Sequence, residues 1–114
     1  MQEYTIKPGQ LYYHFKRKPE QGVEHGAYLV LGLAHDMEDR SKTLVVIKPL
    51  YYCNPRNESE EGISYFVRSL ELFTDSVDRP EHNYNGPRFT LITDERIIHQ
   101  LQAYPLFSSK YLDA

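Results

Sequence analysis

Aromatic, imidazole and guanidinium side chains recur in the apolar segments of this 114-residue chain. The stretch LYYHFKRKP, residues 11–19, joins three aromatic residues, one histidine and three cationic residues. Aromatic rings can hold a flat or cationic ligand by stacking, and arginine can clamp a carboxylate or phosphate through two parallel hydrogen bonds. The candidate ligand-binding side chains are Tyr12, His14, His35, Tyr51 and Arg68.

Two other interpretations of these side chains stay open. Tyrosine and histidine on strands also cover a core while their polar ends remain in water, which needs no ligand. Alternatively, the chain is a hydrolase-like enzyme in which His14 or His35 acts as the general base and Arg68 stabilises developing negative charge. The sequence contains no glycine-rich phosphate loop and no serine-elbow motif that would favour catalysis.

A metal site would have to combine histidines from different segments. If His14 and His35 are cross-strand neighbours, Asp36 and Glu38 would add two carboxylates to two imidazoles, a set that suits zinc. The run HDMED, residues 35–39, is also typical of a solvated turn in which Asp36 bonds its own backbone. We expect no resident metal and no cofactor.

The one cysteine excludes an internal disulfide framework and favours a reducing compartment. Cys53 beside Arg56 could be a thiolate stabilised by a cation, but without a fixed partner residue a buried or inert thiol is favoured.

The charge balance argues against a general affinity for nucleic acid or anionic membranes. Net charge is −3 and the pI is about 5.9, so any such binding must be local. The basic run Lys16, Arg17 and Lys18 beside an aromatic strand leaves an RNA-binding accessory domain as an alternative. The longest apolar run, AYLVLGLA, is too short to cross a bilayer, and we expect a cytoplasmic protein.

Alternation with period two predicts that strands position these side chains. The expected strands, with one helical turn over 69–73 and a C-terminal helix over 94–104, cover residues 11–15, 27–35, 43–52, 65–69 and 87–92. In the first strand, Leu11 and Phe15 should face the core, while Tyr12 and His14 should form a half-exposed surface. Gly32 should mark a bend in the second strand.

Short strands without βαβ alternation predict a mainly β fold. The expected architecture is a small SH3-like antiparallel β-barrel of about five strands with one C-terminal α-helix, in a single domain over 1–114. The barrel should cover residues 9–89, and the helix and tail residues 93–114. An α+β sheet with the helix across one face is the alternative.

Five blocks in register, GQLYYHFK, YLVLGLAH, LVVIKPLYY, FVRSLELF and PRF, resemble a bacterial family of unknown function, DUF1653, over residues 9–89. The resemblance implies a small domain but no particular reaction. The family pattern falls on Gly9, Tyr12, His14, Phe15, Lys16, Tyr28, Val30, Leu31, Gly32, His35, Leu50, Tyr51, Val67, Arg68, Leu70, Phe73, Arg88 and Phe89.

The chain departs from the family pattern at several places. Arg17 stands where the family has glycine, Asp36, Met37 and Glu38 replace Ser-Glu-Thr, and Phe66 replaces tryptophan. The acidic loop 54–62 looks inserted, and the tail beyond residue 90 lies outside the resemblance. The sequence therefore predicts a non-enzymatic binding module for a small anionic or aromatic ligand or a peptide, acting as a monomer or homodimer.

Overall fold

A computed structural model describes residues 5–51, 65–104 and 107 of the chain, which form a mainly β fold. The second and third strands are the longest, with nine and seven residues, and the other strands have three or four. In chain order the elements are β1 (Leu11–His14), η1 (Pro19–Gln21), β2 (Ala27–His35), β3 (Thr43–Pro49), β4 (Phe66–Ser69), α2 (Leu70–Phe73), β5 (Ser76–Arg79), η2 (Pro80–His82), β6 (Tyr84–Pro87), β7 (Phe89–Leu91) and α3 (Glu95–Gln102).

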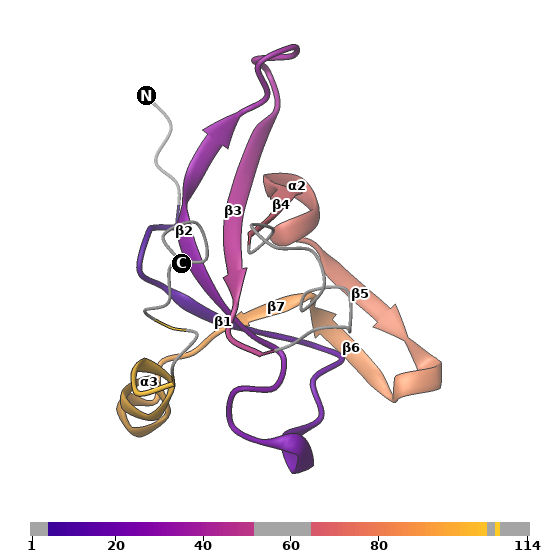
Figure 1. Ribbon diagram of the computed structural model, residues 1–114. Helices are drawn as coiled ribbons and strands as arrows, with labels where there is room; N and C mark the ends of the chain where they lie inside the picture. Colours follow the sequence, from indigo (N-terminus) through magenta and orange to yellow (C-terminus); the bar gives the residue numbers. More distant parts are fainter. Residues whose placement is uncertain (1–4, 52–64, 105–106, 108–114) are drawn as a thin grey trace, which may run out of the picture.

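Five of these strands form one antiparallel sheet in the order β4-β3-β2-β1-β7, and β5 pairs with β6 in a separate hairpin (Figure 1). The expected strands at 11–15, 27–35, 43–52, 65–69 and 87–92 are confirmed within a few residues of their ends. The β5–β6 hairpin was not expected. Figure 1 places it on the opposite side of β1 and β2 from α3.

A β-bulge shifts the register of β2 against β3. Val30 pairs with Ile47, but the next pair joins Gly32 to Val46, so Leu31 is the extra residue. An extra residue reverses the alternation of all side chains that follow it. Leu33 therefore packs with Val30, on the face opposite to the one that simple alternation predicts.

One face of the sheet is buried under α2 and the N-terminal segment. Its buried members, which we call the first core cluster, are Ile6, Tyr12, Val30, Val45, Ile47, Phe73 and Phe89. Phe73 comes from α2, which Ser69 caps by accepting a hydrogen bond from the backbone N–H of Leu72 at 3.2 Å. The cap explains why a four-residue helix holds its place after β4.

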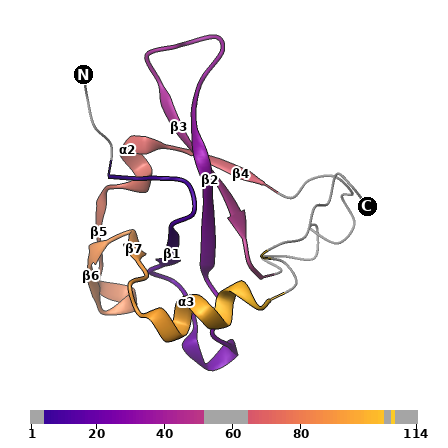
Figure 2. The same cartoon turned by 90° about the vertical axis from the view of Figure 1, so that its left-hand side faces the viewer.

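The other face is covered by α3 (Figure 2). Asp94 caps this helix by accepting a hydrogen bond from the backbone N–H of Arg96 at 2.9 Å. Leu101 is fully buried. The second core cluster consists of Leu11, Ala27, Leu29, Leu50, Ile92 and Leu101.

Burial of both faces overturns two expectations about β1. Tyr12 is only 6% exposed and belongs to the first core cluster, so its expected place on a half-exposed surface is wrong. Leu11 is buried as expected, on the opposite face. Phe15 lies beyond the end of β1 and is half-buried, with its ring stacked on Tyr84 of β6 at a centroid distance of 5.3 Å.

Within the described residues the sheet has two edge strands, β4 and β7, so the closed SH3-like barrel stays a prediction. The C-terminal helix is confirmed. None of the helices in the described segments is long and apolar enough to cross a membrane.

Candidate functional site

Phe89 of β7 lies at the centre of the best-defined cluster of polar and aromatic side chains. Its ring is 5.0 Å from that of His14 and 5.6 Å from that of Tyr28, both edge to face. The Arg68 guanidinium carbon lies 5.6 Å from the Phe89 centroid, within the range of a cation–π contact. Together with Tyr51, these residues form what we call the His14 surface, to which β1, β2, β4 and β7 contribute.

Strand register explains how these four residues meet. His14 pairs directly with Phe89, and Tyr28 lies one strand further across the sheet. Arg68 of β4 pairs with the buried Val45 of β3, and its side chain reaches Phe89 over the same face. Phe89 itself is only 7% exposed and stacks on Phe73 at 4.3 Å, so the first core cluster supports the surface from below.

His14 is held on three sides. Its ring stacks on Phe15 at 4.7 Å and meets Phe89 edge to face, while its Nδ1 accepts a hydrogen bond from the backbone N–H of Lys16 at 3.0 Å. These contacts fix the ring orientation.

Burial and three cations keep the His14 imidazole neutral. The pKa of His14 is lowered from 6.5 to about 4. Burial is the largest cause, and the charges of Arg68, Arg88 and Lys16 act in the same direction. All three side chains are cationic, so the electrostatic potential around the His14 ring is positive.

Arg88 is already engaged in an ion pair. Its Nε donates to Oδ1 of Asp75 at 2.8 Å and its Nη2 donates to Oδ2 at 3.1 Å, a bidentate arrangement. The hydrogen bond from Arg88 is the largest cause that lowers the pKa of Asp75, and the charges of Arg68 and Arg79 act in the same direction. Within the described part of the chain, the Arg68 side chain makes no hydrogen bond or ion pair and is thus a cation that a ligand can engage.

Tyr51 joins this surface through Tyr28. The two hydroxyl oxygens are 2.8 Å apart, within hydrogen-bonding distance, and the rings meet edge to face at 5.7 Å. His25 packs against the other side of Tyr51 at 4.9 Å. The hydroxyl groups of Tyr28 and Tyr51 are therefore held together beside the contact between Tyr28 and Phe89.

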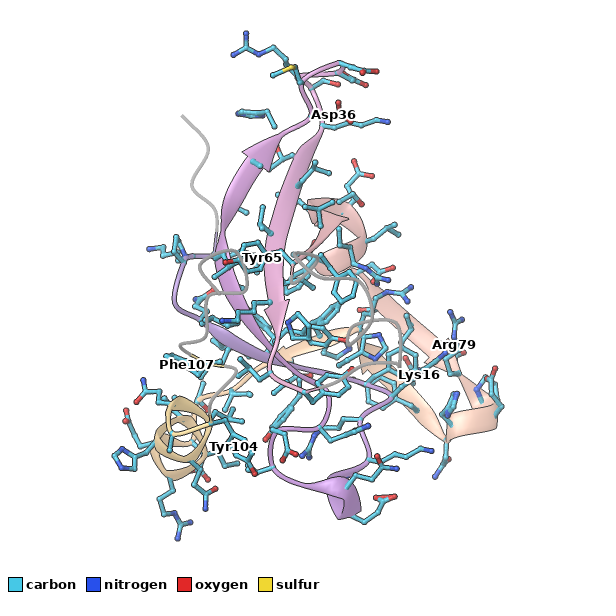
Figure 3. All side chains as sticks on the ribbon, in the orientation of Figure 1. Lys16, Asp36, Tyr65, Arg79, Tyr104 and Phe107 are labelled. Atoms are coloured by element: carbon cyan, nitrogen blue, oxygen red, sulfur yellow. The ribbon has the colours of Figure 1, made fainter. Side chains whose placement is uncertain are left out.

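Two expected site residues lie elsewhere. The Tyr12 ring meets Phe73 edge to face at 5.1 Å, and its hydroxyl donates to Oε1 of Gln10 at 3.0 Å, so Tyr12 supports the core beneath the surface. His35 ends β2, seven residues beyond Tyr28, which separates the two by roughly 20 Å along the strand. Figure 3 labels its neighbour Asp36 at the tip of the β2–β3 hairpin, far from Lys16.

The condition for a metal site, that His14 and His35 are cross-strand neighbours, is not met, since His35 pairs with Thr43 and His14 with Phe89. Oδ1 of Asp36 accepts backbone N–H groups of Glu38 and Asp39 at 2.8 and 3.3 Å, as in a solvated turn. Among the residues described, no group of three or more His, Cys, Asp or Glu side chains could hold a metal ion. Cys53, Arg56 and the acidic loop 54–62 lie outside the described residues.

The basic run 16–18 divides into different roles. Lys16 and Lys18 are exposed, but Arg17 is half-buried and lies 3.8 Å from the Tyr13 centroid. Its Nε donates to the carbonyl oxygen of His25 at 3.0 Å and its Nη2 to that of Gly22 at 3.2 Å. Arg17 therefore braces the loop between β1 and β2 rather than offering its charge to a partner.

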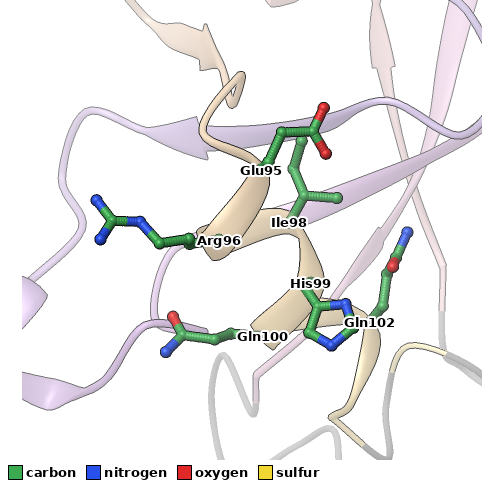
Figure 4. A pocket seen from close by; sticks show the side chains of 6 residues that line it. All are labelled: Glu95, Arg96, Ile98, His99, Gln100 and Gln102. Carbon is green, nitrogen blue, oxygen red and sulfur yellow. The ribbon is translucent and has the colours of Figure 1, made fainter.

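The described residues also line hollows away from or beside this surface. One of about 610 Å³ follows α3 and is lined by that helix alone, mainly by exposed polar side chains such as Arg96 and His99 (Figure 4). Another, of about 350 Å³, lies beside β7 and is lined by Tyr12, Phe73 and Phe89 together with six further residues. We call it the β7 groove, and it shares Phe89 with the His14 surface.

The sequence indicated three members of this surface, His14, Tyr51 and Arg68, and missed two. Tyr28 and Phe89 were assigned only to strands, because alternation does not show that edge-to-face contacts converge on one ring. The sequence feature that could have indicated Phe89 is its position in PRF. It directly follows Arg88, a residue that an ion pair with a carboxylate can fix in place.

Comparison with known proteins gives one family match. The family DUF1653, described as proteins of unknown function, matches residues 10–91, which include every member of the His14 surface. No curated protein and no solved structure matches the chain significantly.

Proposed function

We propose that this chain, which belongs to the DUF1653 family of proteins of unknown function, is a non-enzymatic binding module for a small ligand that carries a carboxylate or another oxyanion on an apolar or aromatic body. The ligand would contact the His14 surface. All five side chains of this surface come from one chain, so we propose a monomer as the binding unit.

One observation carries the choice of an anion. The chain has a net charge of −3, yet the three charged groups that affect the pKa of His14 are all cations, namely Arg68, Arg88 and Lys16. The carboxylate of Asp75 is hydrogen-bonded to Arg88 and feels the charge of Arg68 only at longer range, so three cations face one anion here. Such a local excess of positive charge favours an anionic partner even on an acidic protein.

The apolar half of the ligand is inferred from the rings. Arg68 lies over Phe89, where a guanidinium can bind an oxyanion while the ring beneath excludes water from one side. Tyr28 meets Phe89 edge to face and offers further ring surface, and the β7 groove is lined by Tyr12, Phe73 and Phe89. Aromatic walls with a few oriented polar groups are typical of small-molecule sites.

The alternatives receive less support. A hydrolase that uses His14 as a general base needs a free imidazole nitrogen, but Nδ1 accepts the Lys16 N–H group. An RNA-binding surface built on 16–18 loses Arg17 to its bonds with carbonyl oxygens. We retain the SH3-like barrel as part of the proposal, since stacking of Tyr84 on Phe15 brings the β5–β6 hairpin against the end of β1.

A matched pair of probes tests the proposal. Benzoate and benzylamine share a phenyl ring but carry opposite charges, so only benzoate should cause saturable chemical-shift changes in an NMR titration. Replacing Arg68→Gln should weaken benzoate binding by about tenfold or more, the usual loss for one charge-assisted hydrogen bond. Arg40→Gln, at the exposed tip of the β2–β3 hairpin, is the matched control and should change nothing.

Equal binding of both probes, or equal loss in Arg68→Gln and Arg40→Gln, would show that charge at Arg68 does not select the ligand.

A further inference from the structure

Two histidines, His14 and His25, are held in the same way by one turn. Nδ1 of His14 accepts the backbone N–H of Lys16 at 3.0 Å, and Nδ1 of His25 accepts the backbone N–H of Lys18 at 2.9 Å. A neutral imidazole has one N–H donor and one acceptor nitrogen. Because Nδ1 is the acceptor in both rings, both carry their proton on Nε2.

The turn that donates these bonds is itself anchored. The backbone N–H of Arg17 donates to the carbonyl oxygen of His14 at 3.1 Å, and the Arg17 guanidinium bonds the carbonyl oxygens of His25 and Gly22. The same guanidinium lies over the Tyr13 ring. Lys16 and Lys18 therefore present their N–H groups from a fixed backbone, which orients both imidazoles.

Both rings border the surface proposed to bind the ligand. His14 contacts Phe89, and His25 contacts Tyr51, whose hydroxyl is paired with that of Tyr28. Nδ1 of each ring faces the 16–18 turn, so Nε2 is the nitrogen left to meet a ligand.

Resting on the proposed function, we propose that His14 and His25 are fixed hydrogen-bond donors of the binding site, which read the acceptor oxygens of an oxyanion through their Nε2–H groups. These two imidazoles and the Arg68 guanidinium would present only donors to a ligand. Ligands that need an acceptor from the protein, such as ammonium groups, gain nothing from these side chains.

The same bonds argue against metal binding by either ring. A histidine that binds a metal through Nε2 must carry its proton on Nδ1, where it usually donates to an acceptor. Here Nδ1 of both His14 and His25 meets a backbone N–H donor instead. A metal on Nε2 would therefore place two hydrogens against each other at Nδ1.

The charged groups around His14 support a donor that does not titrate near neutral pH. Lys16 approaches from its own turn, Arg68 from β4, and Arg88 from the residue before β7, with Asp75 bound to Arg88. The rings of Phe15 and Phe89 cover the imidazole itself. Charging His14 would add a fourth cation and would cost the Lys16 hydrogen bond, so the neutral donor persists from pH 6 to pH 8, about two units above its pKa at the lower end.

Multiple-bond ¹H–¹⁵N NMR spectra of protein labelled in its histidine rings test this without any ligand. They should show the Nε2–H tautomer for His14 and His25, with the His14 nitrogens unchanged between pH 8 and pH 6. A spectrum with Nδ1–H for either ring, or titration of His14 in this range, overturns the inference whatever benzoate does. Zinc chloride alone should leave both rings unshifted; a zinc-dependent shift of either ring also overturns it.

A pair of substitutions connects the tautomer to ligand binding. The amide nitrogen of glutamine can take the place of Nε2, whereas the shorter asparagine cannot reach that position. His14→Gln should therefore keep benzoate affinity within about threefold, and His14→Asn should lose about tenfold. Equal losses in the two variants contradict the role of His14 as a donor. Absence of benzoate binding to the wild-type protein contradicts the proposed function instead, and the ligand-free spectra tell the two failures apart.

Discussion

Because His14 is half-buried among cations and resists protonation, the folded protein loses stability in acid. His14 has a pKa lowered to about 4 in the folded chain, against 6.5 for an exposed imidazole. Between these values the unfolded chain binds more protons than the folded one. Stability is therefore present above pH 6.5 and is lost as the pH falls toward 4.

We expect the free energy of unfolding to fall by about 1 to 2 kcal/mol between pH 6.5 and pH 4 because of His14 alone, since water screens part of the effect on a half-buried ring. Urea denaturation at several pH values measures it. His14→Gln lacks the titrating group, so its stability should depend less on pH by this amount. Parallel pH profiles of the two proteins would mean that His14 is not perturbed in the folded state.

At the residue scale, strand alternation predicted which side chains share a face of the sheet, but not what covers that face. Alternation correctly separated Tyr12 and His14 from Leu11, but it could not show that both faces of the sheet are covered. Tyr12 is buried because Phe73 of α2 packs on it, a contact between segments far apart in the chain. The central role of Phe89 likewise depends on contacts from three other strands.

At the scale of the elements, two glycines near β2 differ in how much space surrounds them. Gly26 lies in the loop before the strand, and Gly32 lies at its bulge. Gly26 has a positive φ of 75°, and a Cβ there would collide with the Cβ of Arg17 in the turn that orients the two histidines. Gly32, which the sequence indicated as the bend, lies at the bulge but has open space within 4 Å of its Cβ position.

Gly26→Ala should therefore destabilise the fold by about 2 kcal/mol or more, through backbone strain and displacement of Arg17. Gly32→Ala is the matched control and should change the free energy of unfolding by less than about 0.5 kcal/mol. Thermal or urea denaturation compares them. Equal stability of the two variants would mean that the 16–18 turn does not pack against Gly26.

The β5–β6 hairpin escaped sequence analysis for physical reasons. Its strands have four residues each, and Pro80 and Pro87 interrupt or end them. The turn depends on Asn83, whose φ of 51° is left-handed, a conformation that asparagine tolerates but that no strand pattern reveals. Longer strands such as β2, rich in branched apolar residues, were predictable from local sequence alone.

On the scale of the whole molecule, the helix outside the family match completes the core. The match covers residues 10–91, whereas α3 covers Glu95–Gln102. Leu101 of this helix is 0% exposed and packs with Leu11, Leu29 and other members of the second core cluster. A chain cut after Thr93 would leave that face of the sheet in water.

Leu101→Ala should cost about 3 kcal/mol, typical of a large-to-small change at a fully buried site. His99→Ala, on the exposed side of the same helix, should cost less than about 0.5 kcal/mol. Chains that end at Thr93 should lose cooperative thermal unfolding. A truncated chain that melts like the full protein would refute the place given to α3 in the core.

The central claim is that strands from distant parts of the chain gather Arg68 and His14 over Phe89 to hold an oxyanion. Anomalous diffraction from crystals soaked in 4-iodobenzoate tests it most directly, because iodine locates the ring. We predict a carboxylate beside the Arg68 guanidinium and Nε2 of His14, with the iodinated ring against the aromatic side chains around Phe89. Iodine sites confined to other faces of the molecule would contradict the account.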